Sequence, residues 1–192
     1  MTTGQPGSLP FYLVGSPRLW TMHVVVMGVT GCGKTTAGLR IAEELRAEFV
    51  DADEFHSPDA VAKMAADVPL TDDDRWPWLD RVGEWLAGGQ DRVVACSALK
   101  RAYRDAIRQH APGAIFIHLH APQETLEARV RRRSETTGHY AGTGLLDSQF
   151  ATLEPLAPDE LGVGVDVGEH DPQAVALIAR AAIDAARDSG AR

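Results

Sequence analysis

A phosphate-binding loop of the form G-x-x-x-x-G-K-T occupies residues 28–35, and it constrains the fold more than any other feature of this chain. The residues before it, 22–27, are apolar and rich in valine, which predicts a buried strand. The residues after it, 36–45, repeat their apolar positions at helical spacing. Strand, loop and helix follow in the required order, so we expect the chain to bind a nucleoside triphosphate. A chance match in a glycine-rich turn is the alternative, and the flanking elements argue against it.

Each position of the loop has a physical reason. Its glycines let backbone N–H groups converge on phosphate oxygens, and the start of the helix adds positive potential. We expect Lys34 to reach the β- and γ-phosphates of ATP, and the Thr35 hydroxyl to ligate Mg²⁺. The predicted nucleotide-binding residues of the loop are Gly28, Thr30, Gly31, Cys32, Gly33, Lys34, Thr35 and Thr36.

Composition narrows the class of substrate. The formal net charge of -8 argues against a sequence-independent grip on nucleic acid or on an anionic membrane, so a small soluble substrate is expected. No stretch approaches the length of a membrane span. The two cysteines, Cys32 and Cys96, do not make a disulfide framework, and a reduced cytoplasm fits them best. Because the chain contains no asparagine, it lacks the Asn-Lys-x-Asp box of guanine-specific switch proteins.

Apolar runs alternate with helical patterns along the rest of the chain. After the first strand and helix, we expect strands at 48–51, 93–96, 114–120 and 163–167, and helices at 58–66, 71–87, 100–110, 122–133 and 172–186. This pattern predicts an α/β fold of the P-loop NTPase type, a three-layer sandwich with a five-stranded parallel sheet and helices on both faces. Ligands would bind at the carboxyl ends of the strands.

The chain is long enough for one such domain but short for two. We expect that single domain to span residues 22–192. Residues 1–21 are rich in Gly, Pro, Ser and Thr, which predicts a disordered leader, or a natural start at Met22.

Two carboxylates, Asp51 and Asp53, follow the second predicted strand, and alternation along an extended chain would point both to the same side. Phosphoryl transfer needs an acid on the metal side and a group that accepts the proton of the attacking hydroxyl. We expect Asp51 to hold Mg²⁺ through water and Asp53 to act as base or orienter. The alternative is a solvated acidic turn that caps the next helix. The third predicted strand ends in Cys96 and Ser97 instead of an acid, which favours a functional role for Asp51.

Together with the loop, several later blocks resemble the gluconate kinase (gluconokinase) family of P-loop small-molecule kinases. The blocks are DADEFH at 51–56, KM at 63–64, PLTDDDRWPWL at 69–79, CSALKRAYR at 96–104 and LLDSQFATLE at 145–154. The resemblance implies a sheet like that of nucleoside monophosphate kinases. It also implies phosphorylation of D-gluconate by ATP at its terminal hydroxyl to 6-phospho-D-gluconate, a step of gluconate degradation that feeds the pentose phosphate pathway. Similar proteins are often homodimers.

A small polyhydroxy acid offers one carboxylate and many hydroxyls, and the blocks contain suitable partners for both. The substrate-binding helices would lie at about 54–90. The candidate substrate-binding residues are Asp53, His56, Arg75, Lys100 and Arg104. Two of them have a structural alternative, since Arg75 could pair with Asp72 and Arg104 could lie on a solvated helix face. Trp76 and Trp78 are expected to pack the core or to close the pocket floor.

Arg129 and Arg133 lie four residues apart on one predicted helix face, and a segment rich in Gly, Thr and Ser follows. This pattern predicts a mobile lid over about 130–148. Its closure would bring Arg133 to the transferring phosphate as a catalytic cation, while Arg129 could stack on adenine. The alternative is an arginine-rich helix face solvated by water. The lid centre, Gly138-His139-Tyr140-Ala141-Gly142, departs from the Gly-His-Phe-Met-Pro-like sequence usual in the family.

Two further function classes stay open. One is a kinase of the same architecture that acts on shikimate or a nucleoside monophosphate, which the blocks around His56, Arg75 and Lys100 disfavour. The other is a non-catalytic nucleotide-binding or regulatory module, which the presence of Asp53 disfavours.

Overall fold

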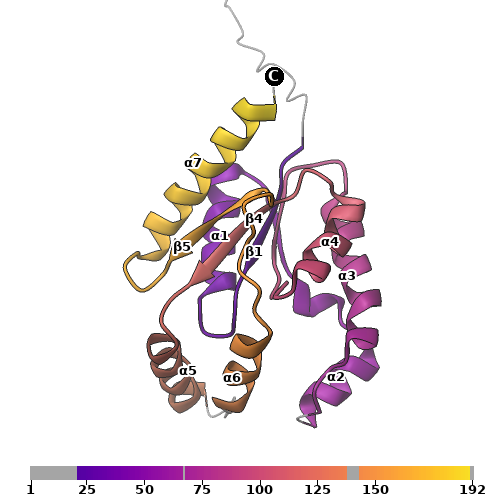
Figure 1. Ribbon diagram of the computed structural model, residues 1–192, viewed down its shortest axis with the longest axis vertical. Coiled ribbons are helices and arrows are strands. Elements are labelled where there is room, and N and C mark those ends of the chain that lie inside the picture. The colour runs from indigo at the N-terminus through magenta and orange to yellow at the C-terminus, as the bar shows by residue number, and fades with distance from the viewer. Residues whose placement is uncertain (1–20, 67, 138–142, 191–192) are drawn as a thin grey trace, which may run out of the picture.

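The computed structural model describes residues 21–66, 68–137 and 143–190, and a five-stranded parallel sheet lies at its centre (Figure 1). The strands are β1 (His23–Met27), β2 (Glu48–Asp51), β3 (Arg92–Ala95), β4 (Ile115–His120) and β5 (Gly162–Asp166). They lie in the order β2-β3-β1-β4-β5, and every pairing is parallel. Because β1 lies between β3 and β4, the loop that follows it opens at the middle of the carboxyl edge of the sheet, where such folds bind ligands. The predicted fold class is confirmed.

Helices cover both faces of this sheet and complete three layers. On one face lie α1 (Lys34–Leu45) and α7 (Pro172–Gly190), and on the other lie α3 (Asp72–Leu86) and α4 (Arg101–His110) (Figure 1). The side chains of β1 alternate between the two cores, with Val24 and Val26 facing α1 and with Val25 and Met27 facing α3 and α4. A strand buried on both faces needs apolar residues at every position, which explains the unbroken run in the sequence.

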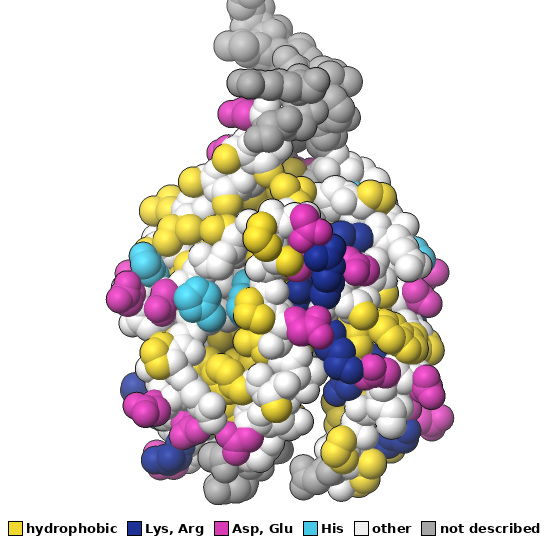
Figure 2. Space-filling view, viewed as in Figure 1, with side chains coloured by type: hydrophobic (Ala, Val, Ile, Leu, Met, Phe, Trp, Pro, Cys, Tyr) yellow, Lys and Arg dark blue, Asp and Glu magenta, His cyan; other side chains and the backbone are white. Residues whose placement is uncertain are grey.

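Three more helices project beyond the carboxyl edge of the sheet. These are α2 (Pro58–Ala65), α5 (Gln123–Thr137) and α6 (Thr143–Thr152). In Figure 1, α5 and α6 form one arm and α2 forms the other, and Figure 2 shows the surface hollowed between the two arms. This hollow, which we call the notch, opens at the carboxyl edge of the sheet, and the phosphate loop follows β1 at that same edge. Within the described ranges, no helix combines the length and the apolar character needed to cross a bilayer.

The arm formed by α5 and α6 differs from the prediction. No helix was expected between those at 122–133 and 172–186, but the structure places a regular helix, α6, over Thr143–Thr152, which overlaps the end of the predicted lid at 130–148. The mobility of that lid stays a prediction. Leu146 of α6 is fully buried in the core beside α1, and Phe150 packs one turn later against the same core. Tertiary packing of these two side chains outweighs the weak helix signal of the glycines and threonines around them. The centre of the predicted lid, 138–142, and the predicted leader up to residue 20 lie outside the described residues.

Candidate active site

The three glycines of the phosphate loop adopt positive φ angles, and they serve two purposes. A Cβ atom at Gly28 would lie 2.4 Å from the Leu119 carbonyl oxygen, and one at Gly31 would lie 2.7 Å from a methyl group of Val130. These two glycines let the loop pack against the body of the protein. A Cβ atom at Gly33, where φ is 92°, would meet nothing within 4 Å. Gly33 therefore faces open space at the start of α1, where unpaired backbone N–H groups favour an anion.

The polar side chains of the loop contact neighbouring acceptors. Lys34 Nζ donates to the Val29 carbonyl at 3.2 Å, and Thr35 Oγ1 donates to Asp51 Oδ2 at 2.8 Å. A hydroxyl and a carboxylate this close together form a pair of hard oxygen donors of the kind that Mg²⁺ prefers. The predicted metal-side residues, Thr35 and Asp51, are thus brought together.

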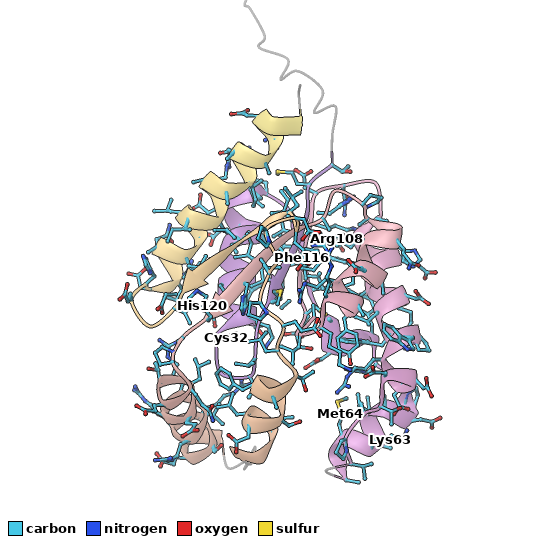
Figure 3. The ribbon with its side chains drawn as sticks, viewed as in Figure 1. Cys32, Lys63, Met64, Arg108, Phe116 and His120 are labelled. Atoms are coloured by element: carbon cyan, nitrogen blue, oxygen red, sulfur yellow. The ribbon has the colours of Figure 1, made fainter. Side chains whose placement is uncertain are left out.

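Two other loop residues have different surroundings. Cys32 is buried next to Gly28 (Figure 3), and this burial raises the pKa of its thiol, so the side chain packs as a small apolar group. Thr36, in contrast, is exposed in the first turn of α1.

The acidic pair after β2 has a geometry that differs from the prediction. The chain does not stay extended through Asp53, because β2 ends at Asp51 and residues Ala52–Phe55 form a 3-10 helix, η1. Asp51 caps this turn by accepting the N–H of Asp53 at 3.2 Å. The argument from strand alternation was therefore wrong. Both carboxylates nevertheless remain at the carboxyl edge, because the turn keeps Asp53 directly beside Asp51.

The immediate surroundings of Asp53 suit a proton acceptor. The Asp53 side chain lies at the rim of the site and is 83% exposed, yet the protein around it removes part of its hydration. This desolvation, followed by the negative charge of Asp51, raises the pKa of Asp53. A carboxylate with a raised pKa holds a transferred proton more readily, which is what a general base needs.

His56 lies beneath Asp53 against an aromatic surface. Its ring stacks on Trp78 with a centroid distance of 4.5 Å, and its Nε2 atom is 3.8 Å from Asp53 Oδ1. Burial lowers the pKa of His56 against the opposing effect of Asp53, so the neutral imidazole is favoured. Its Nδ1 atom is buried with no hydrogen-bond partner among the described residues.

The two tryptophans occupy different positions. Trp78 is buried and donates its Nε1–H to the Ala52 carbonyl at 2.7 Å, which fixes the turn that carries Asp53. This confirms the expected packing role of Trp78. Trp76 is more exposed and meets the Tyr103 ring edge-on at 5.5 Å.

A cluster of polar side chains from α3 and from the start of α4 surrounds Asp72. Lys100 Nζ donates to both carboxylate oxygens of Asp72, at 2.8 and 3.0 Å, and Tyr103 Oη donates to Oδ1 at 2.6 Å. Arg75 Nη1 donates to Tyr103 Oη at 3.3 Å and lies 3.7 Å from Asp72 Oδ1. We call these four residues, Asp72, Arg75, Lys100 and Tyr103, the Asp72 cluster. The hydrogen bonds from Lys100 and Tyr103 lower the pKa of Asp72, and the bond to Asp72 raises the pKa of Lys100.

The Asp72 cluster brings Arg75 and Lys100 together, two of the residues predicted to bind the substrate. The sequence also allowed Arg75 to pair with Asp72, and the structure shows this pairing. With two cations and one carboxylate, the cluster keeps an excess positive charge that suits an anionic ligand.

Arg104 corrects a prediction. Its side chain is fully buried, so it neither reaches the notch nor lies on a solvated helix face. Its Nε and Nη2 atoms each donate to a carboxylate oxygen of Glu160 at 2.7 Å. The rest of the guanidinium donates to the carbonyl oxygens of Ala98, Leu99, Glu154 and Pro155. The sequence could not indicate this role, because Glu160 lies 56 residues further along the chain.

The two arginines of α5 lie on the surface of the protein. Arg129 Nη2 donates to the Val167 carbonyl at 2.7 Å, which ties α5 to the chain that follows β5. Arg133 lies one turn further along the same helix and is also exposed. The roles of Arg129 toward adenine and of Arg133 toward the phosphate stay predictions.

Three residues with direct contacts in the site had no predicted role. Tyr103 and Asp72 lie inside quoted sequence blocks, but their contact with Lys100 depends on how α3 packs against α4. Gln149 of α6 accepts the Thr30 N–H of the phosphate loop at 2.6 Å, across 119 residues of sequence. The only signal for Gln149 was its place in the block at 145–154.

Comparison with known proteins agrees with this geometry. A protein-family profile described as an AAA domain matches residues 24–156. The thermosensitive gluconokinase of Escherichia coli (strain K12) is 37% identical over 170 residues, which are 86% of this chain and 89% of that protein. A solved gluconokinase from Sinorhizobium meliloti 1021 is 42% identical with a TM-score of 0.74, covering 87% of this chain and 92% of that one. A solved sugar kinase from Janibacter sp. HTCC2649 is 45% identical with a TM-score of 0.79, covering 85% of this chain and 95% of that one.

Proposed function

The chain belongs to the gluconokinase family and carries the AAA domain that the profile describes, and we propose that it phosphorylates D-gluconate with ATP. The product would be 6-phospho-D-gluconate, formed at the terminal hydroxyl. The observation that carries the proposal is the placement of a phosphate loop and the Asp72 cluster at the same edge of the sheet. The loop suits a triphosphate, and the cluster suits the carboxylate of a sugar acid.

On the nucleotide side, the backbone N–H groups from Gly31 to Thr35 would bind the β- and γ-phosphates, and Lys34 would exchange the Val29 carbonyl for a phosphate oxygen. Thr35 would hold Mg²⁺ directly and Asp51 would hold it through water. When bound there, Mg²⁺ would neutralise charge on the phosphate oxygens.

On the acceptor side, Lys100 and Arg75 would bind the gluconate carboxylate, while His56 would hydrogen-bond one of the hydroxyls. Asp53 would accept the proton of the terminal hydroxyl as that oxygen attacks the γ-phosphorus and the bond to the β-phosphate oxygen breaks. The support is the raised pKa of Asp53 and its place directly beside Asp51.

Four further assignments complete the proposal. Arg133 would neutralise charge on the transferring phosphoryl group, and Arg129 would stack on adenine, both on the basis of their position on α5. The two buried free cysteines support a place in the reducing cytoplasm. A homodimer is proposed from the family resemblance, and light scattering of the purified protein tests it.

A coupled ADP-release assay tests the function. Mg-ATP is supplied with gluconate, other sugar acids, shikimate or nucleoside monophosphates, and Lys34→Ala and Asp53→Asn are compared with the wild type. We expect turnover with gluconate, its loss in Lys34→Ala, and a fall of about 100-fold or more in Asp53→Asn.

Other outcomes would change the assignment. Activity only on another acceptor would keep the fold and overturn the substrate. ATP binding without turnover of any acceptor would point to a regulatory module. Full turnover by Asp53→Asn would remove Asp53 from the role of base.

A further inference from the structure

The end of α6 and the residues after it lie between two loops that the proposed reaction uses. At one end, Gln149 Oε1 accepts the Thr30 N–H of the phosphate loop at 2.6 Å. At the other end, Glu154 makes two contacts with the loop that carries Lys100. The Glu154 N–H donates to the Leu99 carbonyl at 2.8 Å, and Glu154 Oε2 accepts the Arg101 N–H at 2.6 Å. A segment of six residues thus bonds to both loops.

The Lys100 end of this segment is anchored in the interior. Arg104 donates both to the Leu99 carbonyl and to the Glu154 carbonyl, and its charge is held by buried Glu160. Lys100 is the N-cap residue of α4 but makes no side-chain cap hydrogen bond. The carboxylate of Glu154 instead caps the helix from outside, where the first N–H groups and the helix dipole favour a negative charge.

We propose that residues 149–154 act as a positioning strap that sets the separation between the phosphate loop and Lys100, with Gln149 and Glu154 as its positioning residues. This inference rests on the proposed function. Both side chains bind backbone N–H groups, so they fix the course of each loop without contributing a reactive group. In-line transfer depends on the distance between the γ-phosphate and the acceptor hydroxyl, and a displacement of about 1 Å can cost on the order of 100-fold in rate.

The strap can be weakened without unfolding the protein. Leu146 and Phe150 keep α6 in the core, and they do not depend on Gln149. The Thr30 N–H is only half-buried, so water can replace a lost side-chain acceptor. Loss of the Gln149 contact should therefore alter the position of the phosphate loop more than it alters the stability of the fold.

The experiment compares acceptor-deleting and acceptor-preserving variants at each end. Gln149→Leu and Glu154→Ala remove an acceptor, whereas Gln149→Glu and Glu154→Gln keep one. We expect the first two to lower kcat about tenfold or more, with the KM for ATP and for gluconate changed less than about threefold. The second two should restore most of kcat, although the new carboxylate of Gln149→Glu should raise the KM for ATP.

Two matched controls separate the strap from a general loss of side-chain contacts. Gln123→Leu removes a glutamine of α5 whose side chain, among the described residues, donates to the side chains of Glu127 and Asp147 and to no backbone group. Asp159→Ala removes an acid that binds the side chain of Arg101 instead of its N–H. Both controls should keep kcat within about twofold of the wild type. An unchanged kcat in Gln149→Leu and Glu154→Ala, or a loss that Glu154→Gln fails to restore, would overturn the strap.

Amide hydrogen exchange tests the strap independently of gluconate turnover. ADP bound to the wild type should slow exchange of the backbone amides at 97–101. In Gln149→Leu, ADP should still bind, but this distant protection should be lost. If protection persists in Gln149→Leu, the strap is wrong. If the wild type shows the protection but does not phosphorylate gluconate, the strap stands and the proposed substrate is wrong.

Discussion

The phosphate loop and the Asp72 cluster lie at the same edge of the sheet, yet they are built in opposite ways. The loop is one run of eight residues, 28–35, and its binding groups are backbone N–H groups whose directions follow from three glycines at positive φ. The Asp72 cluster is made of side chains from two helices, and Lys100 meets Asp72 across 28 residues of sequence. The proposed nucleotide recognition is thus encoded in local backbone geometry, whereas the proposed acceptor recognition depends on how α3 packs against α4.

This difference predicts that substitutions in the two regions act in different ways. A change in the loop should act on the ligand directly, because the loop carries its own geometry. A change behind the Asp72 cluster should act through the fold, because the positions of its side chains depend on buried contacts further inside.

Arg104 is expected to give the largest effect on stability. Arg104→Met would leave Glu160 buried with only Arg108 as its charged partner, at a cost of about 3–5 kcal/mol in the free energy of unfolding. Urea denaturation measures this loss. The double variant Arg104→Met/Glu160→Leu removes both charges and should be more stable than the single variant. If the single variant were as stable as the wild type, the buried Arg104–Glu160 pair would not stabilise the fold behind the Asp72 cluster.

Gly33 tests the loop by a change that adds one methyl group. The added Cβ meets no protein atom, so Gly33→Ala mainly costs the strain of a left-handed residue, about 1–2 kcal/mol. Because the methyl group would occupy the space of a phosphate, kcat/KM for ATP should fall about 100-fold. The contrast is Gly28→Ala, whose Cβ would clash with the Leu119 carbonyl and should chiefly lower the melting temperature. Equal effects of the two variants on stability and on ATP use would contradict the assigned roles of these glycines.

Lys100 provides a matched test on the acceptor side. Lys100→Ala should raise the KM for gluconate about tenfold or more and leave the KM for ATP within about twofold. Lys63→Ala is the control, because Lys63 forms an ion pair of similar length, 2.6 Å, with Asp74 but lies outside the Asp72 cluster. Steady-state kinetics with each substrate varied in turn separates the two constants. If Lys63→Ala raised the KM for gluconate as much as Lys100→Ala, the site would extend to α2.

His118 lies outside both regions and should give the smallest effect. Burial lowers the pKa of His118 from 6.5 to about 4, with a further contribution from His120 and Arg104. The unfolded chain therefore takes up a proton near pH 6.5 and the folded protein only near pH 4, so stability falls as the pH decreases through this window. His118→Leu should reduce the loss of stability between pH 7 and pH 5.5 by about 1 kcal/mol. His120, exposed on the same strand (Figure 3), contributes to the lowered pKa of His118, so His120→Leu should reduce the pH-dependent loss of stability less than His118→Leu does.

The sequence predicted the sheet well because burial on both faces leaves a simple signal. Strands such as β1 and β4 are nearly continuous apolar runs, and their ends were placed to within about one residue. The phosphate loop was equally clear, since all of its constraints lie within a single motif.

Two failures have physical reasons that lie outside any short window. The helix α6 is stabilised because Leu146 and Phe150 pack in the core. The glycines around 142–144 give no local signal for a helix. Arg104 looked like a cation free to bind a substrate, because its partner Glu160 is remote in sequence. Lys100 and Arg75 were placed near the substrate by family resemblance, and no local pattern would have separated them from other surface cations.

Because all five strands run in the same direction, the notch at their carboxyl ends lies opposite the amino edge of the sheet. β1 begins at His23 on the amino edge of the sheet, and the end of α7 lies near that same edge, opposite α2, α5 and α6 (Figure 1). A tether at this edge would leave the notch facing the bulk solution. The protein can therefore be immobilised on a surface, or fused to a second enzyme that consumes its product, without the attachment crossing the notch, where we propose that ATP and gluconate bind.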